Sequence, residues 1–192
     1  MRLSIFIGNF VMAILIWVPS VSHAAWEIEP SHTHVAFSVG HLGLTRTPGI
    51  FRSVSGQVNF NESDISASSV KLIIASASVE TANATRDAAL RGSDWFDSDA
   101  YPDITFTSKA VKYVAFKHYT VSGDLTVRGG SVPVEFDLIM TDQITNSFLK
   151  VPAIGFSGVA HVSRSAFGMT KYLPAITDDV ELTIQLEMNK KP

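Results

Sequence analysis

The sequence predicts a single all-β domain of eight or nine short, mostly antiparallel strands joined in sequence order. Apolar and polar residues alternate along most of the chain, which is the pattern of half-buried strands. A Gly-Gly pair separates two of the alternating segments, as in a tight hairpin. Only one short segment, near residue 88, departs from the alternation and predicts a helix.

The first 24 residues have the layout of a secretory signal peptide. Met1 and Arg2 give a positive start, residues 3–18 are almost uncharged, and Ser22 to Ala24 place small residues before a cleavage point. A membrane anchor is the alternative, but the apolar run is shorter than the roughly 20 residues that span a bilayer. We therefore expect cleavage after Ala24, export to the periplasm and no stable membrane anchor, leaving residues 25–192 as one domain.

Net charge, cysteine content and length limit the classes of function that the protein can have. The net charge is −3, and loss of Arg2 with the signal peptide takes it to −4. This mild acidity argues against nucleic acid and anionic membrane surfaces as partners. There is no cysteine, which excludes disulfides, a thiolate nucleophile and a lipoprotein anchor. The domain is long enough to bury a core or to close a barrel around a cavity.

The strands are predicted from runs with one apolar face. In the last run, Val180, Leu182 and Ile184 face one way while Glu181 and Thr183 face the other. Similar runs place strands at about residues 26–29, 33–40, 49–61, 68–80, 103–114, 118–128, 131–141, 153–165 and 180–188. The tetrapeptide Arg128-Gly129-Gly130-Ser131 predicts a tight hairpin, since primed turns need positive φ angles.

A short helix is predicted over residues 85–92. Thr85 is the predicted N-cap, Asp87 lies in the first turn, and Gly92 ends the helix. The loop that follows, residues 93–102, contains three aromatic residues that need cover, either at the mouth of a cavity or in the core. They are Trp95, Phe96 and Tyr101.

Alternating strands with one apolar face fit either a sandwich or a barrel. Small residues on the inward faces would leave room for a guest inside a barrel, and eight strands enclose space for one small ligand. Glycines in strands also mark bends and bulges, so both explanations stay open. The residues concerned are Gly56, Gly123, Gly158 and Ala160.

Two groups of polar residues are candidates for chemistry. His32, His34 and His41 would have to converge to form the metal site of a metal-assisted hydrolase. Arg164 falls on the apolar face of its strand, and a buried arginine needs a partner. That partner is either Asp87 or another carboxylate, or the anionic head group of a ligand.

Five motifs occur in the order in which they are found in one known family. They are Ser31-His32-Thr33-His34-Val35-Ala36-Phe37 with His41; Arg86-Asp87-Ala88-Ala89-Leu90-Arg91 followed by Trp95-Phe96-Asp97 and Tyr101-Pro102-Asp103-Ile104-Thr105-Phe106; Gly123-Asp124-Leu125-Thr126-Val127-Arg128-Gly129; Arg164-Ser165-Ala166-Phe167-Gly168; and Ile176-Thr177-Asp178-Asp179-Val180. In this order, across residues 26–188, they resemble the YceI-like, polyisoprenoid-binding family. The chain departs from the family where Ala88 and Ala89 replace a frequent histidine and Trp95 a common phenylalanine.

The resemblance implies an antiparallel, eight-stranded, lipocalin-like β-barrel with one short helix. It also implies an exported protein that holds a polyisoprenoid or similar long apolar lipid, with no established catalytic residues and no cofactor. The candidate apolar lining is Phe37, Phe51, Phe106, Leu125, Phe136, Leu138 and Phe156, with Trp95, Phe96 and Tyr101 at the mouth. Candidates for a polar head group or a buried network are His32, Arg86, Arg91 and Arg164.

Two other functions stay open beside lipid binding. One is the metal-assisted hydrolase that uses His32, His34 and His41. The other is a stress-related, partner-binding module with a filled core and no ligand. The sequence leaves the oligomeric state open, a homodimer included. An internal cavity would favour the lipid carrier, and a packed interior would favour the partner-binding module.

Overall fold

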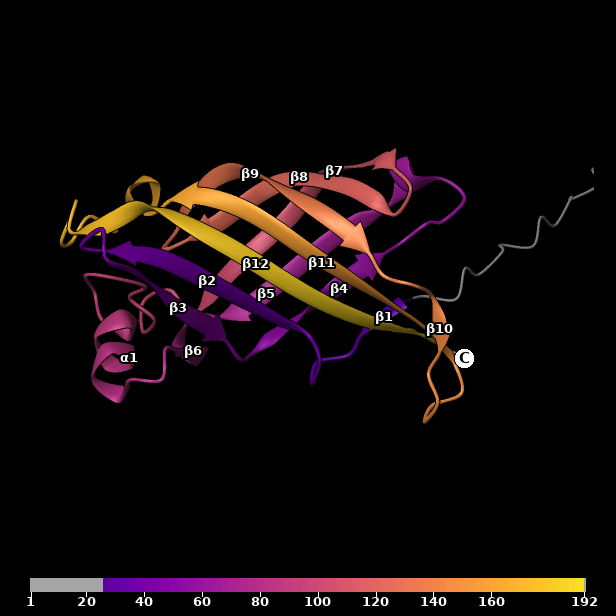
Figure 1. The fold of residues 1–192 in the computed structure, drawn as a ribbon, viewed down its shortest axis with the longest axis horizontal. Helices are drawn as coiled ribbons and strands as arrows, with labels where there is room; N and C mark the ends of the chain where they lie inside the picture. Colours follow the sequence, from indigo (N-terminus) through magenta and orange to yellow (C-terminus); the bar gives the residue numbers. More distant parts are fainter. Residues whose placement is uncertain (1–25, 192) are drawn as a thin grey trace, which may run out of the picture.

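A computed structural model describes residues 26–191, so the predicted signal peptide lies outside the described residues. One antiparallel sheet dominates the structure (Figure 1). Its strands are β1 (Trp26–Ile28), β2 (His34–His41), β3 (Thr45–Phe51), β4 (Val54–Asn59), β5 (Ser69–Ala75), β6 (Val79–Glu80), β7 (Asp103–Ala115), β8 (His118–Val127), β9 (Gly130–Met140), β10 (Ile144–Thr145), β11 (Pro152–Ser163) and β12 (Ile176–Lys190). The helical elements are α1 (Ala84–Arg91) and the short 3-10 helices η1 (Ile65–Ala67), η2 (Ser76–Ser78) and η3 (Arg164–Phe167). No helix among residues 26–191 has the length and apolarity needed to cross a bilayer.

The sheet closes on itself. Strand β12 pairs with β11 along one edge and with β1 along the other, and β1 also pairs with β4. From β4 the pairing runs through β5, β7, β8 and β9 back to β11. This ring confirms the predicted eight-stranded antiparallel barrel and excludes the sandwich.

Eight strand positions, called here staves, make up the wall of the barrel. Three of them are each occupied by two strands in succession. Along β12, β1 and β2 lie one after the other, separated by residues 29–33. Strand β4 continues β3, and β6 continues β5 after η2. At one end of the barrel, called here the helix end, the wall is made by β2, β3 and β6 with α1 beside them (Figure 1). At the other end, called here the far end, it is made by β1, β4 and β5.

The hairpin predicted at the Gly-Gly pair is confirmed. Val127 pairs with Gly130, leaving Arg128 and Gly129 as a two-residue turn. Both have positive φ angles, 50° and 73°, as a type I′ turn requires.

The helix begins earlier than predicted. Asn83 is the N-cap, because its extended backbone lets its side chain accept a hydrogen bond from the Arg86 N–H at 2.9 Å. The prediction of Thr85 as N-cap is therefore wrong, and Thr85 lies inside the first turn. Asp87 in the first turn and Gly92 as the C-cap are confirmed.

The far end of the barrel is filled by aromatic side chains. The rings of Phe60, Tyr119 and Phe156 pack edge to face, with centroids 5.3 to 6.1 Å apart. Leu138, Met140 and Met188 belong to the same core. This cluster closes the far end.

The inward glycines do not leave room for a guest. A Cβ on Gly158 would lie 2.2 Å from Leu138 Cδ2, and one on Gly123 would lie 2.3 Å from the Thr107 carbonyl oxygen. Gly123 also sits beside a register shift between Ser108 and Ala110. The glycines therefore mark bulges and close approaches, which was the second of the two explanations.

Replacing Gly123 with alanine is expected to lower the free energy of unfolding by about 1–3 kcal/mol, because the new methyl group meets backbone that cannot move aside. The matched control is Gly130→Ala in the adjoining strand, where the nearest atom is 3.5 Å away. The control should change stability by less than about 0.5 kcal/mol. Urea unfolding of the three proteins measures both values, and equal losses would contradict the explanation.

Candidate functional site

The barrel contains a cavity of about 320 Å³ at the helix end. This volume lies at the lower end of the roughly 300–1,000 Å³ of ligand pockets. The cavity reaches the surface, since the exposed side chains of His41, Arg86 and Tyr172 border it. It is lined by Val35, Phe37, Val39, His41, Thr47, Phe51, Leu72, Ile74, Thr81, Arg86, Ala89, Leu90, Trp95, Phe96, Ile104, Phe106, Leu125, Val127, Phe136, Val162, Phe167, Met169, Tyr172, Ile176, Val180, Leu182 and Ile184.

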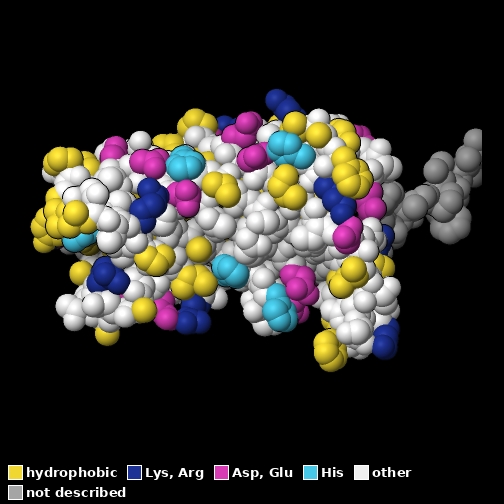
Figure 2. Space-filling view, viewed as in Figure 1, with side chains coloured by type: hydrophobic (Ala, Val, Ile, Leu, Met, Phe, Trp, Pro, Cys, Tyr) yellow, Lys and Arg dark blue, Asp and Glu magenta, His cyan; other side chains and the backbone are white. Residues whose placement is uncertain are grey.

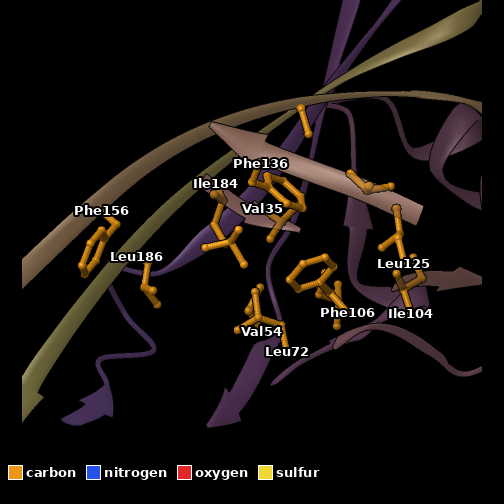
Figure 3. Packing of buried hydrophobic residues seen from close by; sticks show 14 of the residues in the cluster. Val35, Val54, Leu72, Ile104, Phe106, Leu125, Phe136, Phe156, Ile184 and Leu186 are labelled. Carbon is orange, nitrogen blue, oxygen red and sulfur yellow. The ribbon is translucent and has the colours of Figure 1, made fainter. Parts of the chain in front are cut away.

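The inner part of the cavity is apolar and rigidly packed. Phe106 and Phe136 meet edge to face with ring centroids 5.3 Å apart, and Leu125 and Ile184 lie near them (Figure 3). Valines, whose side chains are shorter than those of leucine or phenylalanine, supply much of the remaining wall. These valines are Val35, Val39, Val127, Val162 and Val180. The space thus comes from short wall residues rather than from glycines.

A helix and a loop cover part of the opening. Ala89 and Leu90 of α1 line the cavity, and the Phe96 N–H donates to the Leu90 carbonyl at 2.9 Å, which folds the following loop back over the helix. The Phe96 ring then meets those of Phe51 and Phe37, at 5.2 and 6.4 Å between centroids. The helix end is therefore closed by apolar contacts on one side of the opening only.

Two arginines of α1 hold the helix against the barrel. Arg86 donates from Nε and Nη2 to the side-chain and backbone oxygens of Thr81, both at 2.7 Å. Arg91 donates to the carbonyls of Ala77 at 2.7 Å and Val79 at 3.0 Å. Only Arg86 of the two borders the cavity. Arg91 belongs to a network that positions the helix.

Arg164 is buried without a hydrogen bond to any carboxylate of the described residues. Its guanidinium donates to four carbonyl groups, those of Met169, Lys171, Ile176 and Thr177. Desolvation by burial lowers the pKa of this guanidinium, which is only 3 % exposed. The prediction of Asp87 as its partner is wrong, since Asp87 instead accepts hydrogen bonds from the Thr81 N–H and hydroxyl.

Arg164 and its neighbours order the loop before β12. The Trp95 ring lies 5.3 Å from the guanidinium carbon, and its centroid is 6.4 Å from that of Tyr172. Asp178 accepts from the N–H and hydroxyl of Ser165, and these hydrogen bonds lower the pKa of its carboxyl group. Two cavity residues, Trp95 and Tyr172, are thereby held in place.

The predicted site residues divide between the two ends of the barrel. Eight line the cavity: Phe37, Phe51, Trp95, Phe96, Phe106, Leu125, Phe136 and Arg86. Leu138 and Phe156 lie instead in the far-end core, and Tyr101 packs outside, against Gly129. Arg91 and Arg164 bind backbone carbonyls beside the cavity. His32 lies in the β1–β2 connection with its side chain 68 % exposed.

The three histidines do not converge. His34 begins β2 and His41 ends it, so their Cα atoms are roughly 23 Å apart along the strand. His32 lies near Glu29 and Glu187. Within residues 26–191, no group of three or more metal-ligating side chains is suitably placed to hold an ion. The geometry that a metal-assisted hydrolase needs is therefore not formed by these residues.

Sequence reasoning missed several lining residues. The alternation places Leu182 and Ile184 on one face of their strand, yet it does not tell at which height in the barrel a residue lies. Met169 and Tyr172 stand in a loop, where no periodic pattern exists.

Comparison with known proteins identifies relatives over nearly the whole described chain. A family model described as YceI-like domain matches residues 26–188, the span of the resemblance seen in the sequence. The UPF0312 protein YE1254 of Yersinia enterocolitica is 31 % identical over 183 residues, or 94 % of each chain. The crystal structure of BcnA from Burkholderia cenocepacia is similar with a TM-score of 0.76 and 25 % identity, covering 84 % of this chain and 99 % of that one.

A further solved structure shares the fold at lower identity. It is described as a polyisoprenoid binding domain from Saccharophagus degradans implicated in plant cell wall breakdown. Its TM-score is 0.64 with 16 % identity, and the likeness covers 88 % of this chain and 99 % of that chain. At this identity the likeness concerns the fold.

Arg164→Met is expected to lower the free energy of unfolding by about 3–5 kcal/mol, because it leaves four carbonyls without their donor, two in the loop before β12 and two in its first residues. Arg46→Met is the control. Arg46 is an exposed arginine that hydrogen-bonds only Ser38, so its loss should cost less than about 1 kcal/mol. Thermal and urea unfolding give both values, and a loss for Arg164→Met no larger than that of the control would refute the role.

Proposed function

Because the chain belongs to the YceI-like domain family, we propose that it is a binding or carrier protein for a polyisoprenoid or a similar long-chain apolar lipid. The hydrocarbon tail of the lipid lies in the cavity at the helix end. Its polar end lies at the opening, beside Arg86 and His41.

The cavity is the observation that carries this proposal. Its inner wall consists of aromatic and aliphatic side chains, and its polar residues are few: His41, Thr47, Thr81 and Arg86. Removing an apolar chain from water is favourable by about 0.8 kcal/mol per CH₂ group. A five-carbon isoprene unit therefore gains on the order of 3–4 kcal/mol when fully buried, without any hydrogen bond.

A neighbour of the same fold supports the ligand class. The Saccharophagus degradans structure is described as a polyisoprenoid binding domain. An elongated apolar ligand also suits a barrel that is packed with aromatic rings at one end and hollow at the other.

The polar residues at the opening favour a ligand with a head group. Arg86 is exposed and already oriented by two hydrogen bonds to Thr81. A guanidinium held in this way loses little side-chain entropy when it binds an anion such as a phosphate. His41, at the end of β2, borders the same opening.

Export is part of the proposal. We infer cleavage after Ala24 and a periplasmic location from the order of charge, apolar run and small residues at the N-terminus. A lipid that is insoluble in water needs a protein to carry it through an aqueous compartment.

The first test asks whether the cavity binds lipid. Protein recovered after expression of the full chain is extracted for mass spectrometry, and binding of a fluorescent prenyl lipid is titrated. Ala89→Trp places a large ring into the cavity and should weaken binding at least about tenfold, since it takes the volume that the ligand needs. Ala88→Trp, on the neighbouring position outside the cavity, is the matched control and should bind normally. Absence of extracted lipid together with absence of saturable binding would overturn the proposal.

The second test concerns the head group. Arg86→Met should weaken binding of a prenyl pyrophosphate by about ten- to a hundredfold, as expected for loss of a charge-assisted contact. Binding of the corresponding prenyl alcohol should change by less than about threefold, because its chain contacts are unaffected. Arg91→Met, on the same helix but away from the cavity, is the control. An equal loss for both ligands would show that Arg86 acts only on the helix.

A further inference from the structure

Four large apolar side chains stand exposed around the opening of the cavity. They come from the turn between β2 and β3 and from the loop that precedes β12. Their exposed fractions are 57 % for Leu42, 80 % for Leu44, 60 % for Tyr172 and 38 % for Leu173. We call these four residues the rim. Figure 2 shows apolar side chains gathered at this end of the molecule, where Figure 1 places the start of β12 and the end of β2.

The rim is one surface, although its two parts lie far apart in the sequence. The Leu42 N–H donates to the Ala175 carbonyl at 2.6 Å, which joins the turn to the loop. The Ile176 N–H donates to the Tyr172 carbonyl at 2.9 Å. Beneath them, Arg164 binds the carbonyls of Lys171 and Ile176. The apolar tips are thus held in fixed positions.

Leu42, at the tip of the turn, is an unusual residue for its backbone conformation. Leu42 and Gly43 both have positive φ angles, 55° and 69°. Turns of this kind favour asparagine, aspartate or glycine at these positions. Leu42 and the largely exposed Leu44 give the turn an apolar tip that faces water. Exposed apolar surface of this kind marks an interaction site.

The rim is continuous with the cavity. Tyr172 belongs to both. His41, which precedes Leu42, and Ile176, whose N–H binds the Tyr172 carbonyl, also line the cavity. The Lys171 ammonium lies 5.3 Å from the Tyr172 ring centroid, and the Trp95 ring centroid lies 6.4 Å from it. Tyrosine, tryptophan and lysine beside exposed leucines are the combination found where proteins meet the headgroup region of a bilayer.

We propose that the rim docks on the surface of a lipid bilayer, with Leu42, Leu44, Tyr172 and Leu173 inserted among the lipids and the opening of the cavity facing them. This docking rests on the proposed function for its purpose, since an apolar ligand would then pass between bilayer and cavity without crossing water. The docking itself needs no ligand.

Size and charge favour a bilayer over a protein partner. Four side chains provide far less than the roughly 1,200 Å² of a standard protein interface, whereas a bilayer buries each tip separately. The positive charge of Lys171 is paired with Asp94, and the chain as a whole is acidic. Docking therefore depends on apolar contact, so zwitterionic lipid suffices and salt has little effect.

The test is co-sedimentation with phosphatidylcholine vesicles, using protein recovered after expression of the full chain. The parent protein is expected to sediment with the vesicles to a similar extent in low and high salt. The double variant Leu42→Ser, Leu44→Ser should partition at least about tenfold more weakly, since two apolar side chains are removed. The matched control is Phe148→Ser, which removes a side chain that is 92 % exposed at the far end and should change partition by less than about twofold.

A second measurement separates docking from ligand binding. Leu42 and Leu44 do not line the cavity, so the double variant should bind a prenyl lipid supplied in detergent micelles as the parent does. Vesicle binding without prenyl-lipid binding would support docking while overturning the proposed function. Docking is overturned if the parent does not sediment, or if Phe148→Ser weakens sedimentation as much as the double variant. It is also overturned if the double variant merely converts a dimer into a monomer, because the rim would then join two copies of the chain.

Discussion

The structure depends on β12, the strand that closes the barrel. It pairs with β11 from Ala153–Asn189 to Ser163–Asp179 along one edge, and with β1 and β2 along the other. Closure joins the staves in a ring, so most of their backbone groups pair within the barrel. Closure also fixes an interior that the chain fills unequally, with aromatic rings at the far end and short wall residues at the helix end.

Arg164 extends the order of the barrel into the segment that borders the cavity. A buried guanidinium is costly unless its donors are satisfied, and here four backbone carbonyls satisfy them. The same hydrogen bonds tie the loop residues Met169 and Lys171 to the first residues of β12, Ile176 and Thr177. The position of Trp95 over the guanidinium couples this loop to the segment after α1. The segment after α1 and the loop before β12 therefore both contact the buried guanidinium of Arg164.

Local pattern was enough to predict most of the strands and their faces, the hairpin at Gly129 and the presence of one helix, but neither β10 nor the first residues of β3. It was not enough to place residues along the barrel axis. Phe136 and Phe156 both face inward, yet one lines the cavity and the other packs in the far-end core. Alternation has a period of two residues and carries no information on height, which depends on strand register. The partners of Arg164 could not be predicted either, because they are backbone carbonyls, which every residue has.

An apolar cavity in a domain without disulfides has an energetic consequence of its own. Side chains that line this open cavity of about 320 Å³ contact fewer protein neighbours than side chains packed in the far-end core. Net stabilities of whole domains are only about 5–15 kcal/mol. On the proposed function, an apolar ligand in the cavity supplies further contacts to these side chains and stabilises the native state by mass action. If the cavity binds an apolar ligand as proposed, the stability of the barrel should rise with the occupancy of the cavity.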